Sequence, residues 1–165
     1  MEVVSPYSPK ALGQLEVGEL YLFDYEGITC ISVFLGAPDG VFFDHGILTE
    51  NGEKKFLIRS SNEPAQQCFS LGCAWCLNVP VSPGLLISNS RELEKSGCNI
   101  FLSEDGISMV FYDLQMRGYK YLNAEQKSIR ANPHIKSQVM GLCEFQIYPD
   151  GSWKEKAGAS PVLAF

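Results

Sequence analysis

Turn-forming residues punctuate this sequence at short intervals and leave little room for long helices. The pairs Asn51–Gly52 and Asp105–Gly106 accept the positive φ angles that two-residue hairpin turns require. The Pro-Asp-Gly triplets at 38–40 and 149–151 are equally typical of turns. Runs of β-branched and aromatic residues flank each of these sites, as expected for strands. The sequence therefore predicts a mainly β fold, arranged as a small barrel or a sandwich of antiparallel sheets.

The same pattern gives the expected positions of the strands and helices. Two short surface helices are predicted: residues 90–97, closed by Gly97, and residues 123–130, where Asn123 and Gln126 form a variant of the capping box. Strands are predicted over residues 19–25, 28–35, 41–45, 54–59, 74–79, 84–88, 99–103, 107–113, 119–122 and 139–148.

The chain is long enough for one domain or for two very small ones. It has 165 residues, of which 45% are hydrophobic, so it can bury a real core. Pro80, Pro83 and Gly84 interrupt strand pairing near the middle. They predict an acidic β unit over 1–80 and a second β unit over 84–165, unless the two form one continuous domain. The order of strands and hairpins in the first unit loosely resembles small SH3-like barrels.

Charge is distributed unevenly along the chain. The net charge is −6, and residues 1–80 hold ten acids and four bases, whereas residues 81–165 hold nine of each. No base lies between Lys10 and Lys54, an interval with eight acids. This balance argues against nucleic acid as a partner and favours a basic protein. The residues expected to bind that partner are Glu16, Glu19, Asp24 and Glu26.

These features predict a non-catalytic binding protein of the interaction, adaptor or inhibitor type. The sequence contains no G-x-G-x-x-G, P-loop, H-E-x-x-H or G-x-S-x-G motif. Most common cofactor and hydrolase signatures are thus missing, which lowers the expectation of an enzyme. We expect no cofactor and no bound metal.

Six cysteines support a competing function. Cys68, Cys73 and Cys76 have the spacing C-x4-C-x2-C, and Cys98 follows 22 positions later. This spacing resembles the cluster loop of plant-type ferredoxins, which implies a [2Fe–2S] electron carrier. Zinc binding or thiol redox chemistry by the same group are further possibilities. The simpler expectation is six reduced thiols, with Cys30 and Cys143 buried as small hydrophobic residues.

A third function class follows from the segment Arg117–Tyr121. It alternates bases with Tyr119 and Tyr121, which share one face of the predicted strand and suit stacking on a small ligand or nucleotide. His134 follows in a loop among bases and could contact a phosphate. His45, at the end of a predicted strand, is expected at the surface or in a cap.

The ends of the chain carry further expectations. The first residues lack a basic segment followed by a long apolar run, and no apolar stretch is long enough for a membrane helix. With reduced thiols, this favours a cytoplasmic location and no membrane partner. The last four residues, 162–165, are apolar and should be buried against the chain's own sheet or a second subunit. A homodimer is therefore expected.

Overall fold

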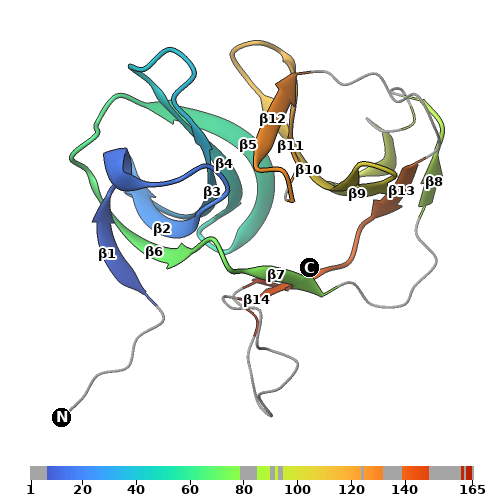
Figure 1. The fold of residues 1–165 in the computed structure, drawn as a ribbon, viewed down its shortest axis with the longest axis horizontal. Helices are drawn as coiled ribbons and strands as arrows, with labels where there is room; N and C mark the ends of the chain where they lie inside the picture. Colours follow the sequence, from blue (N-terminus) through green and yellow to red (C-terminus); the bar gives the residue numbers. More distant parts are fainter. Residues whose placement is uncertain are drawn as a thin grey trace.

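The computed structural model of this protein describes residues 7–78, 85–89, 92, 95–123, 125–131, 139–148, 161, 163 and 164. Within these ranges the chain is mainly β, which confirms the fold class (Figure 1). The described strands form one sheet of twelve and one of three, and neither sheet closes into a barrel. No helix in the described part of the chain is long and apolar enough to cross a membrane.

The described residues of the first half form seven strands and one short 3-10 helix. They are β1 (Ser8–Ala11), η1 (Leu12–Gln14), β2 (Leu20–Tyr25), β3 (Ile28–Gly36), β4 (Phe43–Glu50), β5 (Glu53–Ser61), β6 (Gln67–Gly72) and β7 (Cys76–Asn78). Strands β2 to β5 form an antiparallel meander, and β6 returns to pair with β2 and β1.

The second half continues the same sheet. Its described strands are β8 (Leu85–Ile87), β9 (Ile100–Ser103), β10 (Gly106–Asp113), β11 (Gly118–Asn123), β12 (Ser128–Ala131), β13 (Val139–Leu142), β14 (Gln146–Tyr148) and β15 (Leu163–Ala164). The predicted strand over 139–148 is divided into β13 and β14. The smaller sheet has the order β15-β14-β7, so two residues of the apolar C-terminal segment pair with the chain's own β14.

One parallel pairing joins the two halves. Strand β10 pairs with β11 along one edge, whereas its other edge pairs first with β9 and then with β5. The pairing with β5 is parallel and aligns Tyr112 with Leu57 and Asp113 with Ile58. An entirely antiparallel arrangement was expected. The parallel pairing of β5 with β10, which we call the seam, is the exception within the described strands.

The main core also crosses the middle of the chain. It combines side chains of the first half with side chains of the second, among them Leu20, Val33, Leu48, Phe56 and Ile58 with Ile100, Met109, Phe111, Phe145 and Ile147. The division into units 1–80 and 84–165 remains a prediction, and the shared sheet and core favour its alternative of one continuous domain. Residues 79–84 lie outside the described part of the chain.

The turns follow the sequence closely, but one predicted helix is wrong. Asn51 and Gly52 have φ angles of 48° and 84°, as a type I′ hairpin turn requires. In contrast, the segment 123–130 is the turn between β11 and β12 and the start of β12, because the Asn123 carboxamide accepts the amides of Glu125 and Gln126 in an Asx turn. In the segment 90–97, the described residues Glu92, Lys95 and Ser96 are helical. The turn at 149–151 lies outside the described residues.

Close packing at the seam depends on Gly46. A Cβ atom at this position of β4 would lie 2.8 Å from Cζ of Phe111, a fully buried residue of β10. The Phe111 ring also stacks on Phe56 with a centroid distance of 5.5 Å, and Phe56 meets Phe145 edge to face at 5.8 Å. Gly46 therefore makes the space in which the aromatic groups of the two halves meet.

We predict that Gly46→Ala destabilises the protein by about 1–3 kcal/mol, because the added methyl group collides with a ring that cannot move freely. Urea denaturation followed by fluorescence measures this change. In a Phe111→Leu background, which lacks the colliding atom, the same substitution should cost less. Equal costs in the two backgrounds would show that Gly46 does not act through Phe111.

Candidate binding surface

The four acids expected to bind a partner do not lie together. Glu19 is buried, with 1% of its surface exposed. One carboxylate oxygen accepts Lys10 Nζ at 2.6 Å and the Ser70 hydroxyl, and the other accepts the Glu16 amide at 2.8 Å. Burial alone would raise the pKa of Glu19, but these donors lower it, so the residue stays ionised inside the protein. Glu19 is therefore a structural ion and not part of an exposed surface.

Asp24, near the end of β2, lies close to Glu26 in the turn between β2 and β3. Glu26 and Gly27 have φ angles of 52° and 83°, which form a second type I′ turn. The Asp24 carboxylate accepts the Gly27 amide at 2.8 Å and fixes this turn. Both acidic side chains are exposed. Glu16 is also exposed but precedes β2, so it lies at the opposite end of that strand.

Two neighbouring turns extend this end of the sheet. Asn51 lies in the turn between β4 and β5. Its backbone amide donates to the Thr29 carbonyl at 2.9 Å, and its side-chain oxygen accepts the Thr29 backbone amide at 3.3 Å. The Gln66 side chain donates to the Asp24 carbonyl and brings in the turn of Glu63. We call the exposed carboxylates of Asp24, Glu26 and Glu63 the acidic end.

The three carboxylates of the acidic end have no basic partner among the described residues. No lysine or arginine of the described residues lies within 4.0 Å of its three carboxylates. The nearby acids Glu50 and Glu53 are paired with Arg59 at 3.1 Å and Lys55 at 3.2 Å. The acidic end is thus a small region of uncompensated negative charge, held by hydrogen-bonded turns.

The predicted ligand-binding segment is only partly assembled. Tyr119 and Tyr121 share one face of β11, as expected, but they are half-buried against a cluster that contains Phe101 and Val110. Tyr119 also meets Tyr112 edge to face at 5.2 Å. Arg117 precedes the strand, in a turn with φ of 50°. His134 lies outside the described residues, so its expected role stays a prediction.

The cysteine group is divided between different environments. Cys68 is buried in β6, and burial raises its pKa to about 11, far from the value of a reactive thiolate. Cys73 and Cys76 are half-buried near β7, whereas Cys98 is committed to another cysteine. Among the described residues, no group of three or more potential ligands could hold a metal ion.

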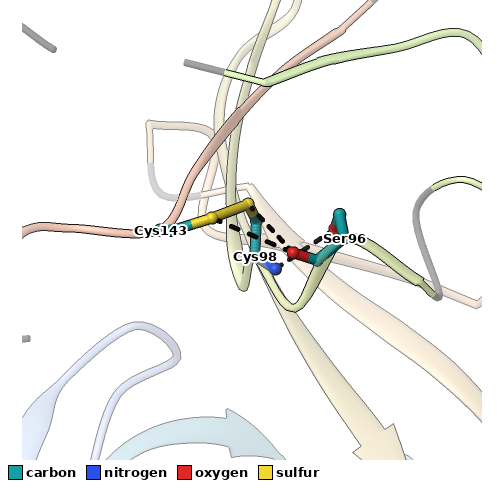
Figure 2. Close-up of a disulfide and its surroundings, with 3 residues drawn as sticks. All are labelled: Ser96, Cys98 and Cys143. Carbon is teal, nitrogen blue, oxygen red and sulfur yellow. Dashed lines mark hydrogen bonds between the residues drawn. A yellow bond between two sulfur atoms is a disulfide. The ribbon is translucent and has the colours of Figure 1, made fainter. Parts of the chain in front are cut away.

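Cys98 and Cys143 form a disulfide bond, shown in Figure 2. Strands β9 and β13 pair with Leu142 opposite Ile100, which brings the two flanking cysteines to a Cα distance of 4.5 Å. The Cys98 amide donates to the Ser96 hydroxyl at 3.1 Å. The expectation of six reduced thiols is therefore wrong, and Cys143 is exposed where a buried position was predicted. Cys30 is buried as expected.

His45 is fully buried and not at the surface. Its Nδ1 contacts the Tyr21 hydroxyl, and its Nε2 lies 3.0 Å from the Ser61 hydroxyl. A neutral ring can donate from one nitrogen and accept at the other, so both hydroxyls can be paired. Burial lowers the pKa of His45 to about 4, against a small opposing effect of Asp44. Such a weak base is poorly suited to proton transfer near neutral pH. Tyr21, His45 and Ser61 therefore form a polar contact within the core.

No family model, curated protein or solved structure matches the chain. Function is therefore inferred from the residues themselves. Of the three sets of candidate residues, the acids give the clearest arrangement. Asp24 and Glu26 lie together, and Glu63 joins them in the acidic end. Glu19 and Glu16 do not belong to it.

The disulfide predicts the number of reactive thiols. In denaturant without a reductant, Ellman's reagent should detect four thiols per chain, those of Cys30, Cys68, Cys73 and Cys76. After reduction all six cysteines should react. The double variant Cys98→Ser/Cys143→Ser should lose about 2–4 kcal/mol of stability, because the unfolded chain is no longer cross-linked. Six thiols in the unreduced protein would contradict this bond.

Burial of His45 predicts a loss of stability on acidification. The unfolded chain takes up a proton below pH 6.5 but the folded chain does so only near pH 4, so stability falls as the pH drops between these values. The loss is roughly 3 kcal/mol. Urea denaturation at several pH values should show a shallower slope for His45→Gln than for His134→Gln, the matched control. Equal slopes would mean that His45 is not the responsible group.

Proposed function

We propose that this chain is a non-catalytic binding protein, of the interaction, adaptor or inhibitor type, that docks a basic protein partner through its acidic end. One observation carries the proposal. The buried acids Glu19 and Asp44 have internal bases, at 2.6 Å and 2.8 Å, whereas Asp24, Glu26 and Glu63 are exposed with no described base beside them. Three unpaired negative charges in neighbouring turns are thus available to an outside partner.

Electrostatic complementarity gives such a surface a physical role. Exposed charges of one sign speed the encounter with a partner of the opposite sign and disfavour partners of the same sign. The turn of Asp24 and Glu26 is fixed by a hydrogen bond of 2.8 Å, so little backbone freedom is lost on docking. Both features support recognition of a basic surface.

The other two functions have less support. A metal-dependent or thiol-dependent protein would use Cys68, Cys73, Cys76 and Cys98, but Cys98 is bonded to Cys143. A nucleotide-binding protein would use Arg117, Tyr119 and Tyr121, whose rings contribute to a half-buried apolar cluster. The acidic end can bind a partner without breaking a disulfide bond or exposing a half-buried ring.

The cytoplasmic location remains a prediction that the disulfide bond opposes. Stable disulfides are rare in a reducing cytoplasm and persist in oxidising compartments. A cytoplasmic protein would hold Cys98 and Cys143 as thiols. Alkylation of the freshly lysed native source, followed by mass spectrometry of the two cysteine peptides, distinguishes these states.

We predict that a fluorescently labelled lysine decamer binds this protein and that its affinity falls as salt increases, since the screening length is already about 10 Å at 0.1 M. Anisotropy titrations should show at least about tenfold weaker binding for Glu26→Lys/Glu63→Lys. Asp24 is left unchanged because its carboxylate fixes the turn.

A matched variant separates local charge from total charge. Glu16→Lys/Glu104→Lys makes the same change in net charge at two exposed acids that are not part of the acidic end, and it should retain most of the affinity. Equal losses in the two double variants would show that only the overall charge matters, and the acidic end would not be the docking site.

A further inference from the structure

Two loops lie at the end of the sheet opposite the turn of Asp24 and Glu26. Residues 37–42 connect β3 to β4, and residues 114–117 connect β10 to β11. Because β4 is antiparallel to β5 and β5 is parallel to β10, the start of β4 and the end of β10 lie at the same end of the sheet. Both loops are at the upper edge of the view in Figure 1.

Lys120 forms ion pairs with one aspartate beside each loop. Its Nζ lies 2.8 Å from the Asp44 carboxylate and 3.2 Å from that of Asp113. Asp44 follows the first loop by two residues, and Asp113 directly precedes the second. Although burial alone would lower the pKa of Lys120, the two carboxylates raise it, so the bridging ammonium group stays charged.

Both loops expose apolar side chains to solvent. In the first loop, 58% of Val41 and 46% of Phe42 are exposed. In the second, the exposed fractions are 50% for Leu114 and 78% for Met116. Exposed apolar groups that gather in one region are typical of interaction surfaces, and Phe and Met are enriched there.

Each loop is held in shape by an aspartate. The Asp39 carboxylate accepts the amides of Val41 and Phe42 at 2.9 and 2.8 Å. The Asp113 carboxylate accepts those of Gln115 and Met116 at 2.9 and 3.0 Å. The apolar side chains are therefore presented on a fixed backbone, which reduces the entropy lost on binding.

The charges beside the apolar groups make the surface complementary to itself. Asp39 is exposed in the first loop, and Arg117 is exposed in the second. A two-fold axis that places the first loop of one molecule against the second loop of another brings opposite charges together twice. It also covers Phe42 and Met116 with apolar groups. A second copy of the chain therefore matches both the apolar residues and the charges of this surface.

We propose that this loop surface, formed by residues 37–42 and 114–117, binds a second copy of the chain about a two-fold axis. Phe42 contacts the partner subunit's Met116, and Asp39 pairs with the partner subunit's Arg117. The contact uses the end of the sheet away from Asp24 and Glu26. It therefore leaves their turn open to a basic partner.

Sedimentation equilibrium of the full chain tests the contact. The expected mass is twice 18.3 kDa, and Phe42→Glu and Met116→Glu should each restore 18.3 kDa. Phe69→Glu is the matched control, since 56% of Phe69 is exposed on β6 and away from these loops; it should remain dimeric. Thermal melts followed by circular dichroism confirm that each variant is folded.

A double-mutant cycle tests the pairing of charges. Asp39→Asn keeps the oxygen that accepts the loop amides but removes the charge, and Arg117→Gln removes the opposite charge. Each should weaken the dimer about tenfold, and the combination should weaken it no further, because either change already breaks both pairs.

Several results would overturn the proposal. A monomer at about 100 μM, a concentration at which even weak specific dimers form, would remove the second copy as the occupant. If Phe42→Glu and Met116→Glu remain dimeric, the contact lies elsewhere. The same conclusion follows if Phe69→Glu alone becomes monomeric. Additive losses in the charge cycle would show that Asp39 and Arg117 do not meet.

Discussion

The contact between Gly46 and the ring of Phe111 determines how the two halves of this protein meet. Without a side chain at Gly46, the ring can lie against the backbone of β4, where an added Cβ would be only 2.8 Å away. Phe56 and Phe145 then complete an aromatic group drawn from both halves. The parallel pairing of β5 with β10 places residues 37–42 and 114–117 at one end of the sheet, and the turn of Asp24 and Glu26 lies at the other. The proposed loop surface thus depends on this pairing.

The acids of the first half divide into internal and external groups. Glu19 and Asp44 are buried and paired with Lys10 and Lys120, so removing either base would leave a buried charge at a cost of about 3–5 kcal/mol. Asp24, Glu26 and Glu63 are exposed, and changing Glu26 or Glu63 should affect stability little, whereas Asp24 also fixes its turn. A count of acidic residues therefore overstates the charge that a partner meets.

Local signals in the sequence predicted much of the fold. The hairpin turns and most of the strands were found because their residues fix φ angles or favour extended backbone. Strand β6 was missed, since its Cys68, Ser70 and Gly72 carry little strand signal and its pairing with β1 and β2 stabilises it. The predicted helix over 123–130 failed because the Asn123 side chain serves an Asx turn as readily as a helix cap.

Long-range contacts could not be predicted in the same way. Nothing near Cys98 indicates Cys143, which lies 45 residues further on, and only the pairing of β9 with β13 brings them together. The burial of His45 likewise depends on Tyr21 and Ser61, from two other strands. Of the candidate site, Asp24 and Glu26 were found from charge alone, whereas Glu63 joins them only through the contact of Gln66 with the Asp24 carbonyl.

The opposite placement of the Asp24–Glu26 turn and the loop surface has a consequence for valency. The eight residues of β4 separate the two ends by about 26 Å, at roughly 3.3 Å per residue. Two molecules joined at their loops would direct their Asp24–Glu26 turns away from each other, roughly 50 Å apart. A short basic peptide would reach only one of them, whereas a partner with two basic regions at that spacing would gain avidity from the high effective concentration of the second. The same pair of surfaces would then discriminate between partners by their reach as well as by their charge.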